Sequence, residues 1–385
     1  MKITHICLCG PLTDNWSYQE NLLPKYHNVI GYEVSVITSQ YIFNDKGKLD
    51  IDDRNVYFNE YGVKTSRIKS KYNTTAKSKF KRYKNLYKTI CSEKPDIIFV
   101  HGCQFLDIKY IVKYVKLNLQ VKVYVDNHAD FFNSASNWLS KNILHKIIWR
   151  RCGRMIEPYT TKFYGVSPSR VDFLKDIYKI PEEKVELLVM GADDEMVDLA
   201  KDCSRIEDLR NKHNIATTDF LIVTGGKIDY NKTETIKLMQ AVKEIDDLSL
   251  KLIIFGSVIE ELKDKFDSLI DGNQIQYIGW VHAADAYKYF SMAELVVFPG
   301  LHSVFWEQVV GLGVPIVVKH LKGFEHIDLG GNVKFLYKDS VAEIQEVLEK
   351  IISNKQAYET MQRVAKEKGM EVFSYQKIAQ RSLEG

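Results

Sequence analysis

The stretch that decides the fold is Val296-Val-Phe-Pro-Gly-Leu-His-Ser-Val-Phe-Trp-Glu-Gln-Val-Val-Gly-Leu-Gly-Val-Pro-Ile-Val-Val318. The runs at 295–298 and 315–318 are short, rich in β-branched residues and free of polar interruptions. Such runs are typical of parallel strands that are covered on both faces. A polar turn, a helix start and a glycine stop lie between them, so the stretch predicts one strand–helix–strand unit of an α/β fold.

The turn inside this unit could bind an anion. We expect Ser303 to cap the following helix, because serine is a favoured helix N-cap residue. The helix N–H groups left without an internal partner would be those of Val304, Phe305 and Trp306. Glu307 and Gln308 follow one turn later, where they could hold hydroxyl groups of the same ligand. The alternative is a turn that binds no ligand, because such turns are common in α/β proteins and the helix dipole alone favours an acidic residue in the first turn.

Length and composition predict two domains. The chain has 385 residues, of which 45% are hydrophobic, and this is enough for two separate cores. We expect an N-terminal domain over residues 1–195 and a C-terminal domain over 196–369. A turn and helix over about 370–385 could pack back on the first domain.

Cysteine usage and the N-terminus bear on the compartment. The six cysteines form no CxxC pair, which fits free thiols in a reducing compartment. No signal peptide and no apolar segment of membrane-spanning length is evident in the sequence. The sequence therefore predicts a cytoplasmic protein that could bind peripherally to the inner face of the plasma membrane.

Strand-like runs alternate with helical segments in both halves, which predicts two Rossmann-like domains with mainly parallel sheets. The further runs are 3–9, 34–38, 97–100, 121–125, 163–168, 185–191, 220–226, 250–256 and 275–278. In open α/β sheets, ligands bind at the carboxyl ends of such strands. Polar residues, among them His101 and His128, follow two of these strands directly.

A glycine- and lysine-rich loop follows the run at 220–226. It reads Gly225-Gly-Lys-Ile-Asp-Tyr-Asn-Lys232, so glycines could allow a close ligand approach while Lys227 and Lys232 supply two cations. The loop would suit a diphosphate. It is neither a GxGxxG fingerprint nor a Walker loop, which argues against the familiar modes of dinucleotide binding and NTP hydrolysis. Two solvated lysines in a loop are the structural alternative.

Several motifs stand in the order found in retaining glycosyltransferases of family 4, which have the GT-B fold. They are the glycine–lysine loop, Gly279-Trp280-Val281 before 285–290, the segment from Pro299 through Glu307-Gln308 to Gly313-Val-Pro315, Gly165-Val-Ser-Pro-Ser169 and Val189-Met-Gly-Ala-Asp193. The chain resembles this family over nearly its whole length. The resemblance implies two Rossmann-like domains that face each other across a cleft, with the donor bound by the second.

On the donor side, the resemblance implies that Lys227 and Lys232 take the place of an arginine and a lysine that grip the diphosphate. Lysine keeps the charge but loses bidentate contact. The family also has two glutamates with seven residues between them, and Gly300 and Gln308 occupy those positions here. Glu307 is one residue out of register.

Donor-sugar contacts therefore have more than one candidate. Glu307 could rotate into the site, or Gln308 could hold the ribose while His302 or Ser303 meets the sugar, with Val304 and Ser303 at the diphosphate. The resemblance places the nucleobase region at Gly256, Trp280 and Val281.

On the acceptor side, Gly10 matches the glycine loop that approaches the donor phosphates. Three residues of the same loop could face an acceptor sugar: Asn15, Trp16 and Tyr18. His128 resembles the family's histidine beside the transferred sugar and is our catalytic candidate together with Lys232. Asp126 and Asp130 could orient His128 or hydrogen-bond the acceptor.

The resemblance implies a front-face mechanism in which the leaving phosphate helps to deprotonate the acceptor. We expect no cofactor, and the co-substrate would be a nucleotide-diphosphate sugar, with UDP favoured and GDP possible. We also expect no metal, because the only DxD spacing, Asp50 to Asp52, lies far in sequence from the other motifs.

The basic charge is concentrated in the first half of the chain. Residues 1–180 carry 29 Lys and Arg against 16 Asp and Glu, whereas residues 181–385 carry 24 against 34. Two basic segments, 64–94 and 138–151, also contain aromatic or apolar residues and could lie on an anionic membrane surface. A solvated face is the alternative, and nucleic acid is disfavoured because no recognised nucleic-acid module accompanies them.

These observations favour a retaining hexosyltransferase that acts on a glycan or lipid-linked glycan in capsule, O-antigen or related surface-polysaccharide synthesis. A non-catalytic GT-B scaffold that binds a partner enzyme or glycan is the alternative, because the first glutamate is missing. A sugar-nucleotide epimerase is a third possibility.

Overall fold

The computed structural model describes residues 1–44, 47–72, 81–132, 134–135, 137–230 and 233–384. The chain divides into two compact units: Met1–Met190 together with Tyr375–Gly385, and Gly191–Ser374. Each unit has its own sheet, and each is described by itself below. Among the described residues, no helix combines the length and the apolar character that crossing a bilayer requires.

The first unit is built on an eight-stranded sheet with the order β10-β9-β8-β7-β1-β2-β6-β5. Its strands are β1 (Lys2–Cys7), β2 (Glu33–Ser39), β5 (Val56–Phe58), β6 (Lys64–Ile68), β7 (Ile97–His101), β8 (Lys122–Asn127), β9 (Lys162–Gly165) and β10 (Val185–Leu187). All neighbours pair in parallel except β5 and β6, which are antiparallel. A small antiparallel hairpin, β3 (Tyr41–Phe43) with β4 (Leu49–Ile51), stands apart from the sheet.

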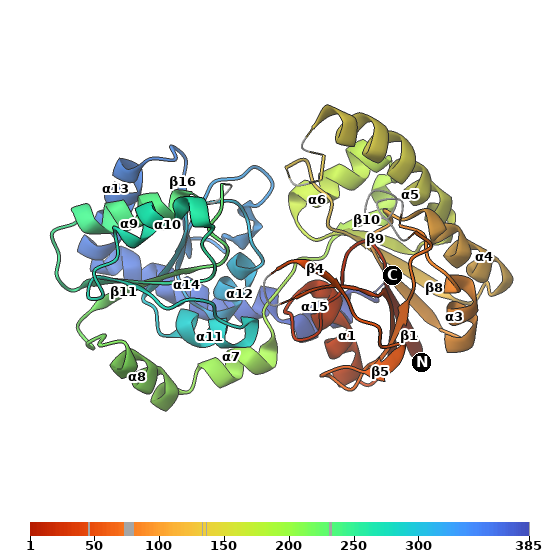
Figure 1. Ribbon diagram of the computed structural model, residues 1–385, viewed down its shortest axis with the longest axis horizontal. Coiled ribbons are helices and arrows are strands. Elements are labelled where there is room, and N and C mark those ends of the chain that lie inside the picture. The colour runs from red at the N-terminus through yellow and green to blue at the C-terminus, as the bar shows by residue number, and fades with distance from the viewer. Residues whose placement is uncertain (45–46, 73–80, 133, 136, 231–232, 385) are drawn as a thin grey trace. The chain divides into compact units, whose positions relative to one another are not determined.

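Helices cover this sheet. They are α1 (Gln19–Val29), α3 (Leu86–Glu93), α4 (Lys109–Leu117), α5 (Arg150–Ile156), α6 (Pro168–Phe173) and α15 (Tyr375–Arg381), with π-helical segments η2 (Ser140–Trp149) and η4 (Leu174–Tyr178) and 3-10 turns η1 (Leu106–Ile108), η3 (Glu157–Tyr159) and η5 (Glu182–Lys184). Although α15 is last in the sequence, it packs beside α1 near the start of the chain (Figure 1). The break that precedes this last helix lies at Ser374, a few residues later than expected, because α14 (Lys355–Phe373) continues through residue 370.

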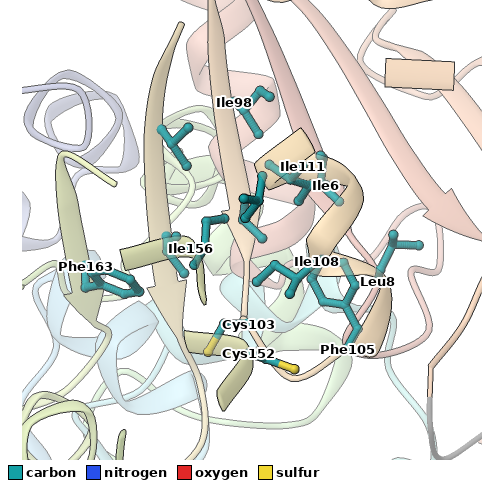
Figure 2. Close-up of a cluster of buried hydrophobic side chains, with 14 of the residues drawn as sticks. Ile6, Leu8, Ile98, Cys103, Phe105, Ile108, Ile111, Cys152, Ile156 and Phe163 are labelled. Carbon is teal, nitrogen blue, oxygen red and sulfur yellow. The ribbon is translucent and has the colours of Figure 1, made fainter. Parts of the chain in front are cut away.

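The core of the first unit lies between the sheet and these helices. Ile6, Ile98 and Ile108 are completely buried there, and Cys103 and Cys152 pack among the same apolar side chains (Figure 2). Burial on this scale removes apolar area from water, which is the main favourable term in folding.

Part of one basic segment that could have formed a surface is buried. The sequence indicates that the basic segment 64–94 could lie on an anionic membrane surface or form a solvated face, but Lys64–Ile68 is the largely buried strand β6. The guanidinium of Arg67, 3% exposed, donates to the carbonyl oxygens of Leu12 and Ser39 at 3.1 Å. Arg67 therefore links the loop that contains Leu12 to the end of strand β2. Residues 73–80 of the same segment lie outside the described residues.

The second unit is built on a six-stranded, fully parallel sheet with the order β13-β12-β11-β14-β15-β16. Its strands are β11 (Phe220–Gly225), β12 (Leu250–Phe255), β13 (Ile275–Tyr277), β14 (Leu295–Phe298), β15 (Ile316–Lys319) and β16 (Val333–Leu336). Its helices are α7 (Asp194–Ala200), α8 (Cys203–Lys212), α9 (Glu234–Glu244), α10 (Glu260–Asp267), α11 (Ala283–Ser291), α12 (Phe305–Leu312), α13 (Val341–Ser353) and α14, with one 3-10 turn, η6 (Glu325–Ile327).

The stretch that opened the sequence analysis forms β14, α12 and β15 of this sheet, so the predicted strand–helix–strand unit is confirmed. The glycine stop is Gly313, whose φ of +86° ends α12 in the left-handed region. Gly369 lets α14 pack closely on α12, because a Cβ there would lie 2.1 Å from the carbonyl oxygen of Val310.

Candidate functional site

A pocket in the second unit lies at the carboxyl ends of β11 and β14. Its lining includes Gly225, Lys227, Gly300 and Ser303. The strand order runs outward in opposite directions from this pair of strands, which makes their junction the topological switch point. Ligands of open α/β sheets bind at such a point.

Lys227 brings positive charge to this pocket. Its side chain is 63% exposed, with Nζ 3.4 Å from a carboxylate oxygen of Asp229. A pair so open to solvent is weak, so the ammonium group remains available to an anionic ligand. Lys232, the other predicted cation, lies outside the described residues.

The glycines at the ends of β11 and β12 are needed for the packing of the protein itself, which the sequence did not reveal. A Cβ on Gly225 would lie 2.3 Å from the ring of Phe255, and a Cβ on Gly256 would lie 1.9 Å from the carbonyl oxygen of Gly226. Gly256 also has φ +121°. The ends of β11 and β12 therefore require these glycines for their own packing, independently of any ligand.

The expected nucleobase region lies beside these glycines. The N–H of Gly256 donates to the carbonyl of Gly279 at 2.7 Å, which brings Trp280 and Val281 close to the end of β12. Trp280 is 59% exposed, so its ring is accessible for stacking against a planar ligand.

Ser303 lines the pocket, and in place of a short cap its hydroxyl oxygen accepts the N–H of Phe305 at the long distance of 3.5 Å. The helix begins at Phe305, and Val304 holds the N-cap position without a side-chain cap. The carbonyl oxygen of Ser303 accepts the N–H of Trp306 at 2.9 Å, so that N–H is occupied. The expected row of three free N–H groups is therefore wrong at Phe305 and at Trp306.

Glu307 is directed into the protein. Its carboxylate is completely buried and accepts from Nε2 of His302 at 2.9 Å and from Nε2 of His326 at 3.1 Å. Burial alone would raise the pKa of Glu307, but the charges and hydrogen bonds of the two histidines outweigh it and lower the pKa to about 2. We refer to these three residues as the Glu307 cluster.

The cluster corrects two expectations. Rotation of Glu307 toward a ligand would leave two buried imidazoles without their acceptor, which is costly. His302 is 5% exposed at the side chain and is held by the same carboxylate, so it is a positioned residue rather than a free sugar ligand. His326 was missed, because it lies nineteen positions along the chain from Glu307. Gln308, on the next position of α12, is also buried.

In the first unit, Asp126 at the end of β8 is the shared acceptor of several buried hydrogen bonds. Its completely buried carboxylate accepts from Nδ1 of His101 at 2.8 Å, from Nε2 of Gln19 at 3.1 Å and from the N–H of Gly102 at 3.1 Å. Burial opposes ionisation, but the charges of His101 and His128 lower the pKa of Asp126 below its ordinary range. Asp126 is therefore a buried anion that already accepts three hydrogen bonds within the first unit.

His128 stands next to this anion. Its Nε2 lies 3.3 Å from an oxygen of Asp126, and its side chain is 29% exposed. Burial would lower the pKa of His128, but the charges of Asp126 and Glu20 raise it above the ordinary value. Of the two roles left open for Asp126, orienting His128 is the one that this geometry allows. Asp130 is buried and paired with Arg170 at 3.3 Å.

Gly10 lies in a loop that is fixed on both sides. The hydroxyl of Tyr83 donates to the carbonyl of Leu8 at 2.8 Å, and Arg67 donates to that of Leu12. Gly10 itself is exposed, and a Cβ there would meet no atom within 4 Å. Its backbone is therefore rigidly held yet open.

The three predicted acceptor-side residues follow in the same loop. Asn15 has φ +62°, and its N–H donates to Glu60 at 2.6 Å. The ring of Trp16 stacks on Phe43 at 5.6 Å and meets Tyr18 edge-on at 5.3 Å. The ring of Trp16 is therefore held by two aromatic neighbours.

Three side chains of the first unit, His101, Asp126 and His128, place ligand atoms within 4.8 Å of one another, so a metal ion must be considered. The Nδ1 of His101 and the Oδ2 of Asp126 are only 2.8 Å apart. Two ligands of a tetrahedral zinc ion are separated by about 3.3 Å, given metal–ligand bonds of about 2.0 Å. The shorter distance fits a shared proton, and we interpret the group as a hydrogen-bonded set. The DxD candidate is likewise engaged, because Asp52 pairs with Arg67 at 2.9 Å.

Solved structures resemble the whole chain. Sucrose-phosphate synthase from Thermosynechococcus elongatus superimposes with a TM-score of 0.73 at 12% identity, over 99% of this chain and 96% of that one. The Anabaena protein HepE, in complex with UDP and glucose, gives a TM-score of 0.65 at 14% identity, over 99% and 98%. The protein therefore has the GT-B fold, as predicted.

Sequence comparison adds the class of the second unit. Residues 205–368, which lie within the second unit, match the family described as Glycosyl transferases group 1. An uncharacterized glycosyltransferase from Methanocaldococcus jannaschii is 22% identical over 224 residues. The alignment spans 57% of this chain and 57% of the length of that relative.

Proposed function

We propose that the protein transfers a sugar, with retention of configuration, from a nucleotide-diphosphate donor to a glycan or lipid-linked glycan. The observation that carries this proposal is the pocket at the switch point of the second unit, within the group 1 domain. Lys227 offers a cation there, and Gly300 and Ser303 offer backbone and hydroxyl groups that suit a diphosphate.

UDP is the favoured nucleotide, supported by the HepE complex with UDP and glucose, and GDP is the other candidate. Lys227, Lys232 and the N–H groups at the start of α12 would neutralise the charge that develops on the departing diphosphate. His128 would contact the transferred sugar or its acceptor, positioned by Asp126. No step in this scheme requires a metal or a cofactor.

Thermal shift with nucleotides tests donor binding. We expect UDP or GDP to raise the melting temperature in the presence of EDTA, and Lys227→Ala or Lys232→Ala to remove most of that rise. Lys263→Ala, on the exposed side of α10, is the matched control and should keep it. No nucleotide-dependent shift with any base, in a folded sample, would refute the proposed donor site.

A non-catalytic scaffold is the alternative, and the Glu307 cluster favours it. Gly300 replaces one expected glutamate, and the nearby Glu307 is bound by two histidines. Product analysis with labelled sugar nucleotides separates the two functions. Transfer that disappears in His128→Ala supports an enzyme, whereas nucleotide or glycan binding without any turnover supports a scaffold.

We further propose that the first unit binds an anionic membrane on the cytoplasmic side, as surface-polysaccharide synthesis on a lipid carrier would require. The segment η2 and the residues before it expose four large apolar side chains: Trp138, Leu139, Ile143 and Ile147, which are 71, 58, 38 and 62% exposed. Lys141, Lys146 and Arg151 flank them. Apolar side chains framed by basic ones bind the interface of anionic bilayers.

Co-sedimentation with vesicles tests this surface. We expect binding to phosphatidylglycerol-containing vesicles, weak binding to pure phosphatidylcholine, and loss of binding in Trp138→Ser with Ile147→Ser. Leu119→Ser, which removes an equally exposed apolar side chain elsewhere, is the control. Equal binding by the double variant and the control would refute the assignment.

A further inference from the structure

Three buried histidines form a continuous hydrogen-bonded chain through the first unit. Starting from Asp126, Nδ1 of His101 lies 2.8 Å from the carboxylate. Nε2 of His101 lies 2.9 Å from Nδ1 of His5, and Nε2 of His5 lies 2.9 Å from Nδ1 of His27. The three side chains belong to β7, β1 and α1, and at most 2% of each residue is exposed.

The far end of the chain has two partners on or just beyond α15. Nε2 of His27 lies 2.9 Å from the hydroxyl of Ser382 and 3.1 Å from the carbonyl oxygen of Ala379. These two groups are 2.8 Å apart. One can donate and the other can only accept, so the end of the chain can satisfy either state of the His27 nitrogen.

Consider first the state in which all three imidazoles are neutral. The ionised carboxylate of Asp126 requires a proton on Nδ1 of His101, because it can only accept. Nε2 of His101 is then bare and must accept from Nδ1 of His5, and the same step repeats at His27. Nε2 of His27 is bare as well, so the hydroxyl of Ser382 must donate to it. All three histidines are Nδ1–H tautomers.

Now consider one additional proton on His101. Both nitrogens of His101 then carry hydrogen, so Nδ1 of His5 becomes an acceptor and its proton resides on Nε2. The same change at His27 places hydrogen on Nε2, which donates to the carbonyl of Ala379, while the hydroxyl of Ser382 turns to that carbonyl too. Each contact still holds one proton. His5 and His27 remain neutral but become Nε2–H tautomers.

The surroundings favour this distribution of charge. Burial, followed by the neighbouring histidines, lowers the pKa of His5 well below its ordinary value, and burial lowers that of His27 to about 3. The additional positive charge therefore stays next to Asp126. Glu20 on α1 and Arg170 on α6 act electrostatically on His128, the thiol of Cys7 on β1 interacts with Asp126, and the ring of Tyr32 lies 6.1 Å from His27.

We propose that His101, His5 and His27 form a tautomer relay. The relay lets the Asp126–His101 pair gain or lose one proton without breaking a hydrogen bond in the core, and so changes the charge beside His128. The pair carries one negative charge in the first state and none in the second. His101, His5 and His27 are thus positioning residues that act on His128 through Asp126.

The consequence for sugar transfer rests on the proposed function. In the state with the extra proton, His128 loses the net negative charge that holds its own proton and its orientation. Transfer should therefore fall on the acid side with the same midpoint as the tautomer change.

Nitrogen-15 NMR of the full chain labelled at histidine tests the relay directly. Lowering the pH should move the protonated nitrogen of both His5 and His27 from Nδ1 to Nε2, with one shared midpoint and without either ring becoming charged. Tautomers that stay fixed from pH 5 to pH 9, or that change at separate midpoints, would overturn the proposal. So would tight binding of added Zn²⁺ that displaces the proton from His101.

Ser382→Ala provides a directional test. The variant removes the hydroxyl that donates to Nε2 of His27 in the neutral state, yet it leaves the carbonyl of Ala379 to accept in the other state. The shared midpoint should therefore rise by about 0.7 pH units, equivalent to one net hydrogen bond. Ser167→Ala, which removes another buried hydroxyl, is the control and should not move the midpoint.

The NMR result and the activity separate the two proposals. A tautomer change in a protein without transfer activity leaves the relay standing and refutes the proposed function. Transfer whose acid limb does not follow the midpoint in Ser382→Ala refutes the link between relay and catalysis. A midpoint that falls or stays in Ser382→Ala overturns the relay itself.

Discussion

Replacement of Glu307 by glutamine should destabilise the second unit, because the carboxylate is the shared acceptor of two buried imidazoles. Its pKa is lowered from 4.5 to about 2, a difference of about 2.5 units. At about 1.4 kcal/mol per unit, the ionised side chain contributes about 3 kcal/mol to the free energy of unfolding near pH 7. The side chain is completely buried, so solvent screening does not reduce this value.

The pH dependence has a definite sign. Because the folded-state pKa lies below the unfolded one, the stabilisation is fully present above about pH 4.5. It is lost progressively as the pH falls toward 2, where the carboxylate becomes protonated in the folded state too. The difference between wild type and Glu307→Gln should therefore be large at pH 7 and small near pH 2.5.

Hydrogen exchange of the α12 amides measures this loss of stability within the second unit, since the two units need not unfold together. We expect the protection of α12 at pH 7 to fall in Glu307→Gln by a factor that corresponds to about 3 kcal/mol, roughly a hundredfold. Glu371→Gln, at an exposed position of α14, is the control. Equal protection in wild type and Glu307→Gln at pH 7 would show that the cluster does not stabilise α12.

Three shorter predictions follow from other contacts. Gly256→Ala should lower the free energy of unfolding by more than about 2 kcal/mol in urea denaturation, because its Cβ would collide with backbone, whereas Gly10→Ala should leave stability unchanged. Arg67→Met should cost about 3 kcal/mol in the same assay and increase proteolysis of the loop that Arg67 holds, since it removes a buried, paired guanidinium. In a native thiol titration, the exposed Cys203 should react first, and the buried Cys103, whose pKa is raised by burial, should react only after unfolding.

The strands of both sheets could be predicted from sequence where they are covered on both faces. The run 295–298 is apolar throughout and the run 250–256 is interrupted only by Lys251, and the structure buries β12 and β14 as parallel strands. β14 has the predicted ends, whereas β12 ends one residue earlier than predicted, because strand ends depend on hydrogen bonds to neighbouring strands. The shortfall is greatest at 185–191, where only Val185–Leu187 is strand.

Buried polar residues could not be predicted, since their partners are distant in sequence. In the sequence, Arg67 is one of many cations in a basic segment. Only the fold brings the carbonyl oxygens of Leu12 and Ser39 within hydrogen-bond distance of it. Glu307 was correctly placed early in α12, but its engagement depends on His326. His101 was visible at the end of a strand, yet its contacts with Asp126 and His5 arise only because β7 lies between β8 and β1 in the sheet.

The register of α12 decides what the altered glutamate pattern means for donor binding. Successive residues of an α-helix are separated by about 100°, so Glu307 and Gln308 cannot face the same side. Glu307 points to His302 and His326, which leaves Gln308 as the residue at the position where the resemblance expects a ribose contact. Ribose hydroxyls are neutral, and an amide oxygen accepts from them as a carboxylate does, with a smaller desolvation cost. The missing charge at this position is therefore compatible with a nucleotide ligand. The carboxylate that stands one residue earlier has a different task, which is to hold the turn before α12 and the turn at η6 together.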